Sequence, residues 1–238
     1  MHIEPGIVTG AKLALSYLTA TSALTLTAGM AWETLRQDGG GYALISRSVI
    51  TTVLVFSFFE VLPHHAVGVS EVHLILGSTL FLMFGAGPTA VGLALGLLMQ
   101  GLFFAPFDLP QYGMNVTTLL VPLWLLSHLA RRLIAPDTLY VRVTYRQALA
   151  LSTAYQGGIV VWVAFWALYG QGVNAENLAS VASFGIAYMS VVILEPLIDL
   201  GVLALAKTFA GVTRGSLFNR RLHQVDHHPV DSSHIMPS

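Results

Sequence analysis

Charged side chains are scarce in this sequence, and cysteine is absent from it. Asp, Glu, Lys and Arg make up 10% of the 238 residues, against about 25% in an average soluble domain. Eleven basic and twelve acidic side chains cannot cover the surface of a chain this long in water. With apolar types at 55%, the composition predicts an integral membrane protein. The lack of cysteine excludes disulfides and thiolate metal sites, and the net charge of -1 offers no basic surface for nucleic acid.

Sequence motifs for nucleotide binding and hydrolysis are missing as well. No G-x-x-x-x-G-K-[ST], H-E-x-x-H or G-x-S-x-G is present. We therefore expect a protein that is not an enzyme. Any uphill transport must then draw its energy from a partner subunit or from an ion gradient.

The start of the chain lacks the features of a secretory signal, which begins with a basic region and ends at a small-residue cleavage site. It reads Met1-His2-Ile3-Glu4-Pro5-Gly6 and contains no Lys or Arg. Because His2 is too large for efficient removal of the initiator methionine, we expect Met1 to be retained with a free amine.

Seven apolar segments predict an all-α polytopic membrane protein, since an apolar helix needs about 20 residues to cross the hydrocarbon core. They cover roughly 11–31, 43–62, 72–85, 87–104, 114–133, 147–170 and 178–207. The third is short for a full span, and Pro196 predicts a kink or tilt in the last. Gly92-x-x-x-Gly96 favours close helix packing. We assign residues 1–210 to one transmembrane domain and 211–238 to a polar cytoplasmic tail.

The basic residues predict the orientation, because Lys and Arg are enriched in cytoplasmic loops. With seven spans, ten of the eleven basic residues fall on one side, and only Lys12 falls on the other. The N-terminus is therefore expected outside and the C-terminus in the cytoplasm.

Four of the nine histidines are expected at the outer face: His2, His64, His65 and His73. The Met1 amine, the His2 backbone nitrogen and the His2 imidazole can chelate one ion in fused rings. Late first-row ions such as Ni(II), Cu(II) and Co(II) promote loss of the amide proton, and three such nitrogens favour the planar field of Cu(II) or Ni(II). His73, expected at the start of the third span, would add a fourth nitrogen, with His64 or His65 as a further ligand. The alternative is that these histidines are merely solvated.

Several acidic residues are candidates for supporting roles. Glu60 or Glu71 would offset the ion's charge and the positive potential expected at the start of the third helix. Glu195 and Asp199, four residues apart in the last span, are either a relay or coupling contact or a satisfied interhelical polar contact. Binding should weaken as pH falls, because the amine, amide and imidazole must lose or lack protons.

The opening residues, the segment 68–77 and the segment 99–115 together resemble the CbiM/NikM family. The first resembles its MHIPDG-like start, and Gly68-Val69-Ser70-Glu71-Val72-His73-Leu74-Ile75-Leu76-Gly77 resembles its GTSGHLLGG motif. Met99-Gln100-Gly101-Leu102-Phe103-Phe104 followed by Gly113-Met114-Asn115 is similar to its Q-x-L-x-F…LGAN stretch. Here one residue is inserted before His73, and Glu71 stands where the family usually has glycine.

Members of that family are substrate-binding components of energy-coupling-factor transporters for cobalt and nickel. The resemblance implies seven spans and metal ligands at Met1, His2 and His73, with Asn115 as a further site residue. It also implies ATPase subunits, a T-component membrane protein and sometimes a small auxiliary membrane subunit as partners, in a bacterial inner membrane. The imported Co(II) or Ni(II) would supply cobalamin synthesis or a nickel enzyme.

Two other functions stay open from the residues. One is a gradient-driven metal permease that acts alone, with Glu195 and Asp199 as the relay. The other is a membrane subunit whose histidines are incidental. The choice between cobalt and nickel also stays open, as does the role of the tail histidines His223, His227, His228 and His234.

Overall fold

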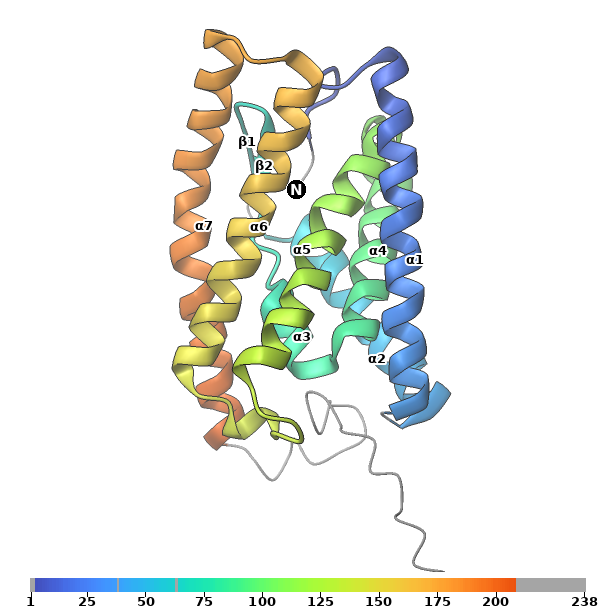
Figure 1. Ribbon diagram of the computed structural model, residues 1–238, viewed down its shortest axis with the longest axis vertical. Helices are drawn as coiled ribbons and strands as arrows, with labels where there is room; N and C mark the ends of the chain where they lie inside the picture. Colours follow the sequence, from blue (N-terminus) through green and yellow to red (C-terminus); the bar gives the residue numbers. More distant parts are fainter. Residues whose placement is uncertain (1–2, 38, 63, 209–238) are drawn as a thin grey trace, which may run out of the picture.

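The structure is a computed structural model that describes residues 3–37, 39–62 and 64–208. Its described residues form a bundle of seven α-helices (Figure 1). The helices are α1 (Leu13–Gln37), α2 (Gly40–Glu60), α3 (Gly77–Phe84), α4 (Ala86–Phe103), α5 (Tyr112–Leu133), α6 (Tyr145–Gln171) and α7 (Ala175–Thr208). One antiparallel hairpin, β1 (His65–Val67) and β2 (Ser70–Val72), joins α2 to α3. Three short 3-10 helices are η1 (Gly10–Lys12), η2 (Pro106–Gln111) and η3 (Tyr140–Arg142).

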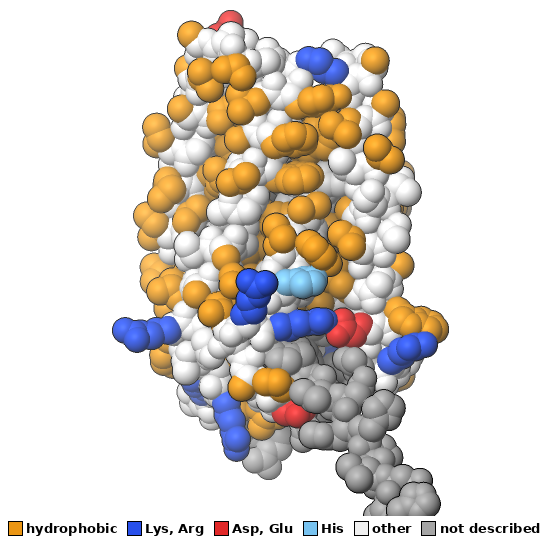
Figure 2. Space-filling model, viewed as in Figure 1, with side chains coloured by type: hydrophobic (Ala, Val, Ile, Leu, Met, Phe, Trp, Pro, Cys, Tyr) orange, Lys and Arg blue, Asp and Glu red, His pale blue; other side chains and the backbone are white. Residues whose placement is uncertain are grey.

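All the helices except α3 are long and apolar enough to cross a membrane, which makes six candidate spans among the described residues. Many large apolar side chains lie on the outside of the bundle, and Figure 2 shows them spread over its length. Exposed leucine, isoleucine and phenylalanine are unfavourable in water but suit contact with lipid. The prediction of an all-α polytopic membrane protein is confirmed.

The predicted third span over 72–85 differs from the structure. In its place the chain forms the β1–β2 hairpin, an irregular segment over 73–76 and the eight-residue helix α3. Figure 1 shows the hairpin and α3 one below the other inside the ring of longer helices. Non-helical backbone is tolerated at membrane depth only where protein or water surrounds it. The enclosing helices meet that requirement here.

The bundle has two chemically different ends. The hairpin end carries β1 and β2, η2 and the turn between α6 and α7. The basic end, opposite, carries the ends of α1, α5 and α7, and seven of the eight Lys and Arg among the described residues lie toward it. Figure 2 shows the blue side chains gathered there, and Lys12 is the described exception at the hairpin end.

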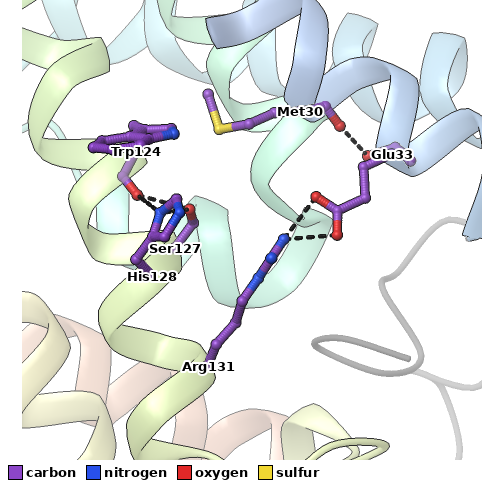
Figure 3. A network of polar contacts seen from close by, with 7 residues as sticks. Met30, Glu33, Trp124, Ser127, His128 and Arg131 are labelled. Atoms are coloured by element: carbon purple, nitrogen blue, oxygen red, sulfur yellow. Dashed lines mark hydrogen bonds and ion pairs between the residues drawn. The ribbon is translucent and has the colours of Figure 1, made fainter. Parts of the chain in front are cut away.

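Close packing of α4 against α2 requires glycine at two positions, and an ion pair links α1 to α5. A Cβ at Gly92 would lie 2.3 Å from Thr51 Oγ1, and one at Gly96 would lie 2.7 Å from Val55 Cγ1. These glycines therefore let α4 approach α2 closely, as predicted. At the basic end Arg131 Nη2 on α5 donates to both carboxylate oxygens of Glu33 on α1, at 2.6 and 2.7 Å (Figure 3).

Candidate metal centre

The N-terminal segment is bound to the hairpin and to α5. Ile3 forms an antiparallel bridge with Ser70, and the Glu4 N–H donates to Val69 O at 3.2 Å. The Ile3 N–H donates to Asn115 Oδ1 at 2.8 Å, and the Ile3 side chain is buried in the core. The pairing is antiparallel, with Glu4 next to Val69 and Ile3 next to Ser70. Ile3 is therefore the end of the pair that lies closer to His73 along the chain of β2.

The second anchor of this segment is α6. A Cβ at Gly170 would lie 2.0 Å from Ile7 O, so only glycine allows the segment to lie directly on this helix. Lys12 Nζ also donates to Gly170 O, at 2.7 Å. Three separate elements thus fix the first described residues of the chain in place.

His73 follows β2 directly and is almost completely enclosed, with 2% of its surface exposed. The edge of its ring packs against Phe59, at a centroid distance of 5.1 Å. His64 stacks on its face at 4.8 Å with the planes 8° apart. The predicted position of His73 at a helix start is wrong, because α3 begins only at Gly77. The positive potential of that helix end therefore does not act at the imidazole as expected.

A carboxylate lies next to the imidazole. Glu71 Oε2 is 3.5 Å from His73 Nε2. Two neighbouring ligands at about 2.1 Å from one ion lie about 3.4 Å apart at a tetrahedral angle and about 3.0 Å apart in a planar field. The separation therefore matches a tetrahedral pair of donors, and in a planar field it places the carboxylate beside the ligands.

Two acidic residues that the sequence analysis missed, Glu4 and Asp108, lie near Glu71. Burial, together with the negative charge of Glu71, raises the pKa of Glu4. Asp108, buried in η2, is close enough to Glu71 and Glu4 for their charges to repel. Sorting the acidic residues by membrane face, as was done for the histidines, would have found Asp108. Repulsion among carboxylates of this kind is relieved when a cation binds beside them.

The other predicted residues are placed less favourably for direct coordination. The rings of His64 and His73 are nearly parallel, so their in-plane lone pairs do not converge, and His64 covers a face of His73. His65 lies in β1 with its side chain exposed. Glu60 ends α2, half-buried, and makes no hydrogen bond or ion pair with the described residues. Asn115 Oδ1 accepts the hydrogen bond from the Ile3 N–H.

Glu195 and Asp199 do not join this site. Both are buried on α7 and face the first turn of α3, where Ser78 Oγ donates to Asp199 Oδ2. His128 is also remote, since it lies toward the basic end with Nδ1 2.9 Å from Trp124 O (Figure 3).

Met1 and His2, the predicted ligands at the chain start, lie outside the described residues, as does the tail over 211–238. Among the residues that are described, no group of three or more His, Cys, Asp or Glu side chains could hold a metal ion. The described part of the chain therefore offers one imidazole and one carboxylate side by side. Ile3 and Glu4, which pair with residues 70 and 69 and are called the N-terminal strand, lie against the start of the same segment.

Comparison with known proteins adds two findings. A family model described as "Cobalt uptake substrate-specific transmembrane region" matches residues 2–211. A solved structure described as the crystal structure of a transition metal transporter has a similar fold, with a TM-score of 0.57. It is 16% identical and covers 90% of this chain and 100% of its own. No match was found among curated proteins.

Proposed function

The chain belongs to this cobalt uptake family, and we propose that it is the substrate-binding component of a transporter for Co(II) or Ni(II). The ion binds at the hairpin end, which faces the outside of a bacterial inner membrane. The chain itself hydrolyses nothing. Energy comes from separate ATPase subunits through a T-component membrane protein, sometimes with a small auxiliary subunit. The imported ion supplies cobalamin synthesis or a nickel enzyme.

One observation carries the proposal: Ile3 is bridged to Ser70, which lies three residues before His73 in the chain. Ile3 is also hydrogen-bonded to Asn115. Because the pairing is antiparallel, the step from Glu4 back to Ile3 is directed along β2 toward His73. We therefore assign the Met1 amine, the His2 backbone and side-chain nitrogens and the His73 imidazole as ligands. The described residues supply no competing set of three donors.

The carboxylates near His73 supply the charge that this ligand set lacks. Amine and imidazole nitrogens are neutral when bound, so a divalent ion in a buried site needs negative charge nearby. Deprotonation of the His2 amide contributes one such charge. Glu71, 3.5 Å from His73 Nε2, contributes another, either as a ligand or beside one. Glu4 and Asp108 add a negative field around the site.

The decisive experiment adds Gly-Pro before Met1. A single added residue would put the imidazole third from a new free amine, where amine, amides and imidazole form another chelate, whereas the proline nitrogen has no proton to lose and blocks it. The extension keeps every side chain and removes the terminal amine from the chelate. We expect Co(II) affinity of the purified full chain to fall by more than about 100-fold, since even outer-shell partners of metal ligands contribute about 10- to 100-fold. A chain with Gly-Pro added after Ser238 is the matched control and should bind as the parent does.

Unchanged Co(II) binding in the N-terminal extension would remove the proposed site. The energy source is tested separately, by measuring cobalt uptake in cells that make the chain with and without ATPase and T-component partners. Uptake by the chain alone would favour a gradient-driven permease.

A further inference from the structure

The segment that carries His73 rests on α7 at two separate places. At the hairpin turn, Gly68 has φ +61°, and a Cβ there would lie 2.2 Å from Ser180 O. At the other end of the segment, the first turn of α3 faces Glu195 and Asp199. Ser180 and Asp199 are roughly 28 Å apart along α7, at about 1.5 Å of rise per residue. His73 lies between the two contacts.

The contact at α3 is polar and fully enclosed. Glu195 is 0% exposed and Asp199 is 2% exposed. Ser78 Oγ donates to Asp199 Oδ2. The Glu195 oxygens face the backbone N–H groups of Ile75, Leu76 and Gly77, although neither reaches full hydrogen-bond geometry with them.

The start of α3 needs this help because it has no cap of its own. Its N-cap is Leu76, whose side chain carries no acceptor and whose backbone is left-handed at φ 54°. Unpaired N–H groups at a helix start attract negative charge, and a leucine in the left-handed region is strained. The carboxyl group of Glu195 meets this need: it places its oxygens at the free N–H groups and so favours the strained turn that exposes them.

On the opposite side α3 is held by α6. A Cβ at Gly77 would lie 2.3 Å from a ring carbon of Tyr155, so the chain passes directly against that ring. The titratable groups around the two carboxylates are Tyr155 of α6, Tyr188 of α7 and Tyr140 of η3. Buried carboxylates inside a membrane are costly, so a contact of this kind is kept where it has a role.

We propose that Glu195 and Asp199 are positioning residues of the metal site, which tie the His73 segment to α7. They fix residues 75–78, and these fix the irregular segment that presents His73 Nε2 beside Glu71. Pro196 lies between the two carboxylates, at a point where a helix bends readily. A movement of α7 at this point therefore moves the metal ligand. The inference rests on the proposed function of His73.

A double-mutant cycle tests this assignment. Co(II) affinity is measured for the full chain, Glu195→Gln, His73→Ala and the double variant. We expect Glu195→Gln to lower the affinity about 10- to 100-fold, the range for outer-shell partners of metal ligands. The same substitution should have no effect when His73 is already alanine. An equal loss in both backgrounds, or no loss in either, overturns the proposal.

Tyr188→Phe is the matched control. It removes a buried hydrogen bond of 2.6 Å between Tyr188 Oη and Gln156 Oε1, which lies near Glu195 but links α7 to α6 and leaves the contact of Ser78 with Asp199 in place. Its Co(II) affinity should equal that of the parent. If His73→Ala itself leaves binding unchanged, the proposed metal site fails. If His73→Ala abolishes binding but Glu195→Gln is silent, only the positioning role fails.

Hydrogen exchange gives a second readout that needs no metal. Glu195→Gln should accelerate exchange at the amides of Ile75, Leu76 and Gly77 by about tenfold or more, while Tyr188→Phe should not. Should Glu195→Gln fail to fold, Ser78→Ala removes the bond to Asp199 without disturbing a buried charge, and the same acceleration is expected. Unchanged exchange in these variants overturns the proposal.

Discussion

His73 is held by its neighbours on three sides. Phe59 packs at its edge, His64 covers its face and Glu71 lies 3.5 Å from its Nε2. Such packing restricts ring rotation before any ion arrives, so binding costs less conformational entropy. The same logic extends to the N-terminal strand, where Asn115 fixes the backbone of Ile3.

Asn115→Ala should therefore weaken both the fold and the site. It leaves the buried Ile3 N–H unpaired, at a cost of roughly 1–3 kcal/mol in unfolding free energy. The N-terminal strand would loosen, and we expect Co(II) affinity to fall at least about tenfold. Thermal unfolding and Co(II) titration of the purified chain measure the two effects.

Asn177→Ala is the control for this variant. Asn177 is also buried at the hairpin end, but its Nδ2 donates to Ala167 O and Gly172 O, between α6 and α7. It should lose comparable stability and keep its Co(II) affinity. Equal affinities for the two variants would contradict the role assigned to Asn115.

The raised pKa of Glu4 predicts that the stability of the apo protein depends on pH. Burial first, and then the charge of Glu71, raises the pKa of Glu4 above its usual 4.5 in the apo protein. The folded chain thus prefers the protonated acid, so the ionised group reduces stability above the raised pKa, and this cost vanishes as pH falls below 4.5. Glu4→Gln should raise the thermal stability of the apo protein at pH 7 and leave it unchanged near pH 3.5.

The same variant should bind metal less tightly at pH 7. A nearby exposed or partly buried charge contributes up to about 1 kcal/mol, which is about fivefold in affinity. Opposite changes in apo stability and in Co(II) affinity are the expected signature. A loss in both would mean that Glu4 acts as a structural residue.

At the scale of elements, hydropathy alone predicted six of the helices and was wrong about the third span. The residues Val72, Leu74, Ile75 and Leu76 are as apolar as a helix core, so composition does not distinguish an extended segment from a helix here. The chain is irregular over 73–76, between a hairpin that rests on α7 and a left-handed Leu76 that delays the start of the helix to Gly77. The contact with α7 and the left-handed backbone of Leu76 depend on the folded structure, and no local sequence pattern predicts them.

The metal site divides in the same way. Residue type and membrane face selected four histidines, and an expected helix start together with the family motif selected His73 among them; its role as a ligand stays a prediction. The roles of Glu4 and Asp108 depend on three distant segments meeting at one end of the bundle, so the local sequence carried no pattern for them. Likewise, Glu195 and Asp199 were recognised as a buried pair, but their contact with α3 became visible only in the fold.

Gly170 tests how the N-terminal strand depends on α6. A Cβ there would meet Ile7 O at 2.0 Å, far inside van der Waals contact, so Gly170→Ala must displace the strand. We expect Co(II) affinity to fall at least about tenfold, because a misplaced chain start no longer reaches His73. Gly157→Ala lies on the same helix with nothing within 4 Å of its Cβ. By helix propensity it should gain up to about 1 kcal/mol and bind Co(II) normally.

At the scale of the whole molecule, the difference in charge between the two ends predicts which side of the membrane the site faces. Seven of the eight described Lys and Arg lie toward the basic end, while His73 and its carboxylates lie toward the hairpin end. Lys and Arg are retained on the cytoplasmic side during insertion, whereas Asp and Glu have little influence. A metal site at the hairpin end is therefore expected to meet ions outside the cell, as uptake requires.

Single cysteines test this orientation directly, because the chain has none of its own. Val173→Cys places an exposed thiol at the hairpin end, and Ala135→Cys places one in the loop at the basic end. A membrane-impermeant maleimide should label the first in intact spheroplasts and the second only after permeabilisation. Each variant is the control for the other, since the reagent and the membrane are the same. The reverse pattern would turn His73 toward the cytoplasm, where an uptake protein has no use for a capture site, and the assignment of the chain as an importer would fall even if Co(II) binding were normal.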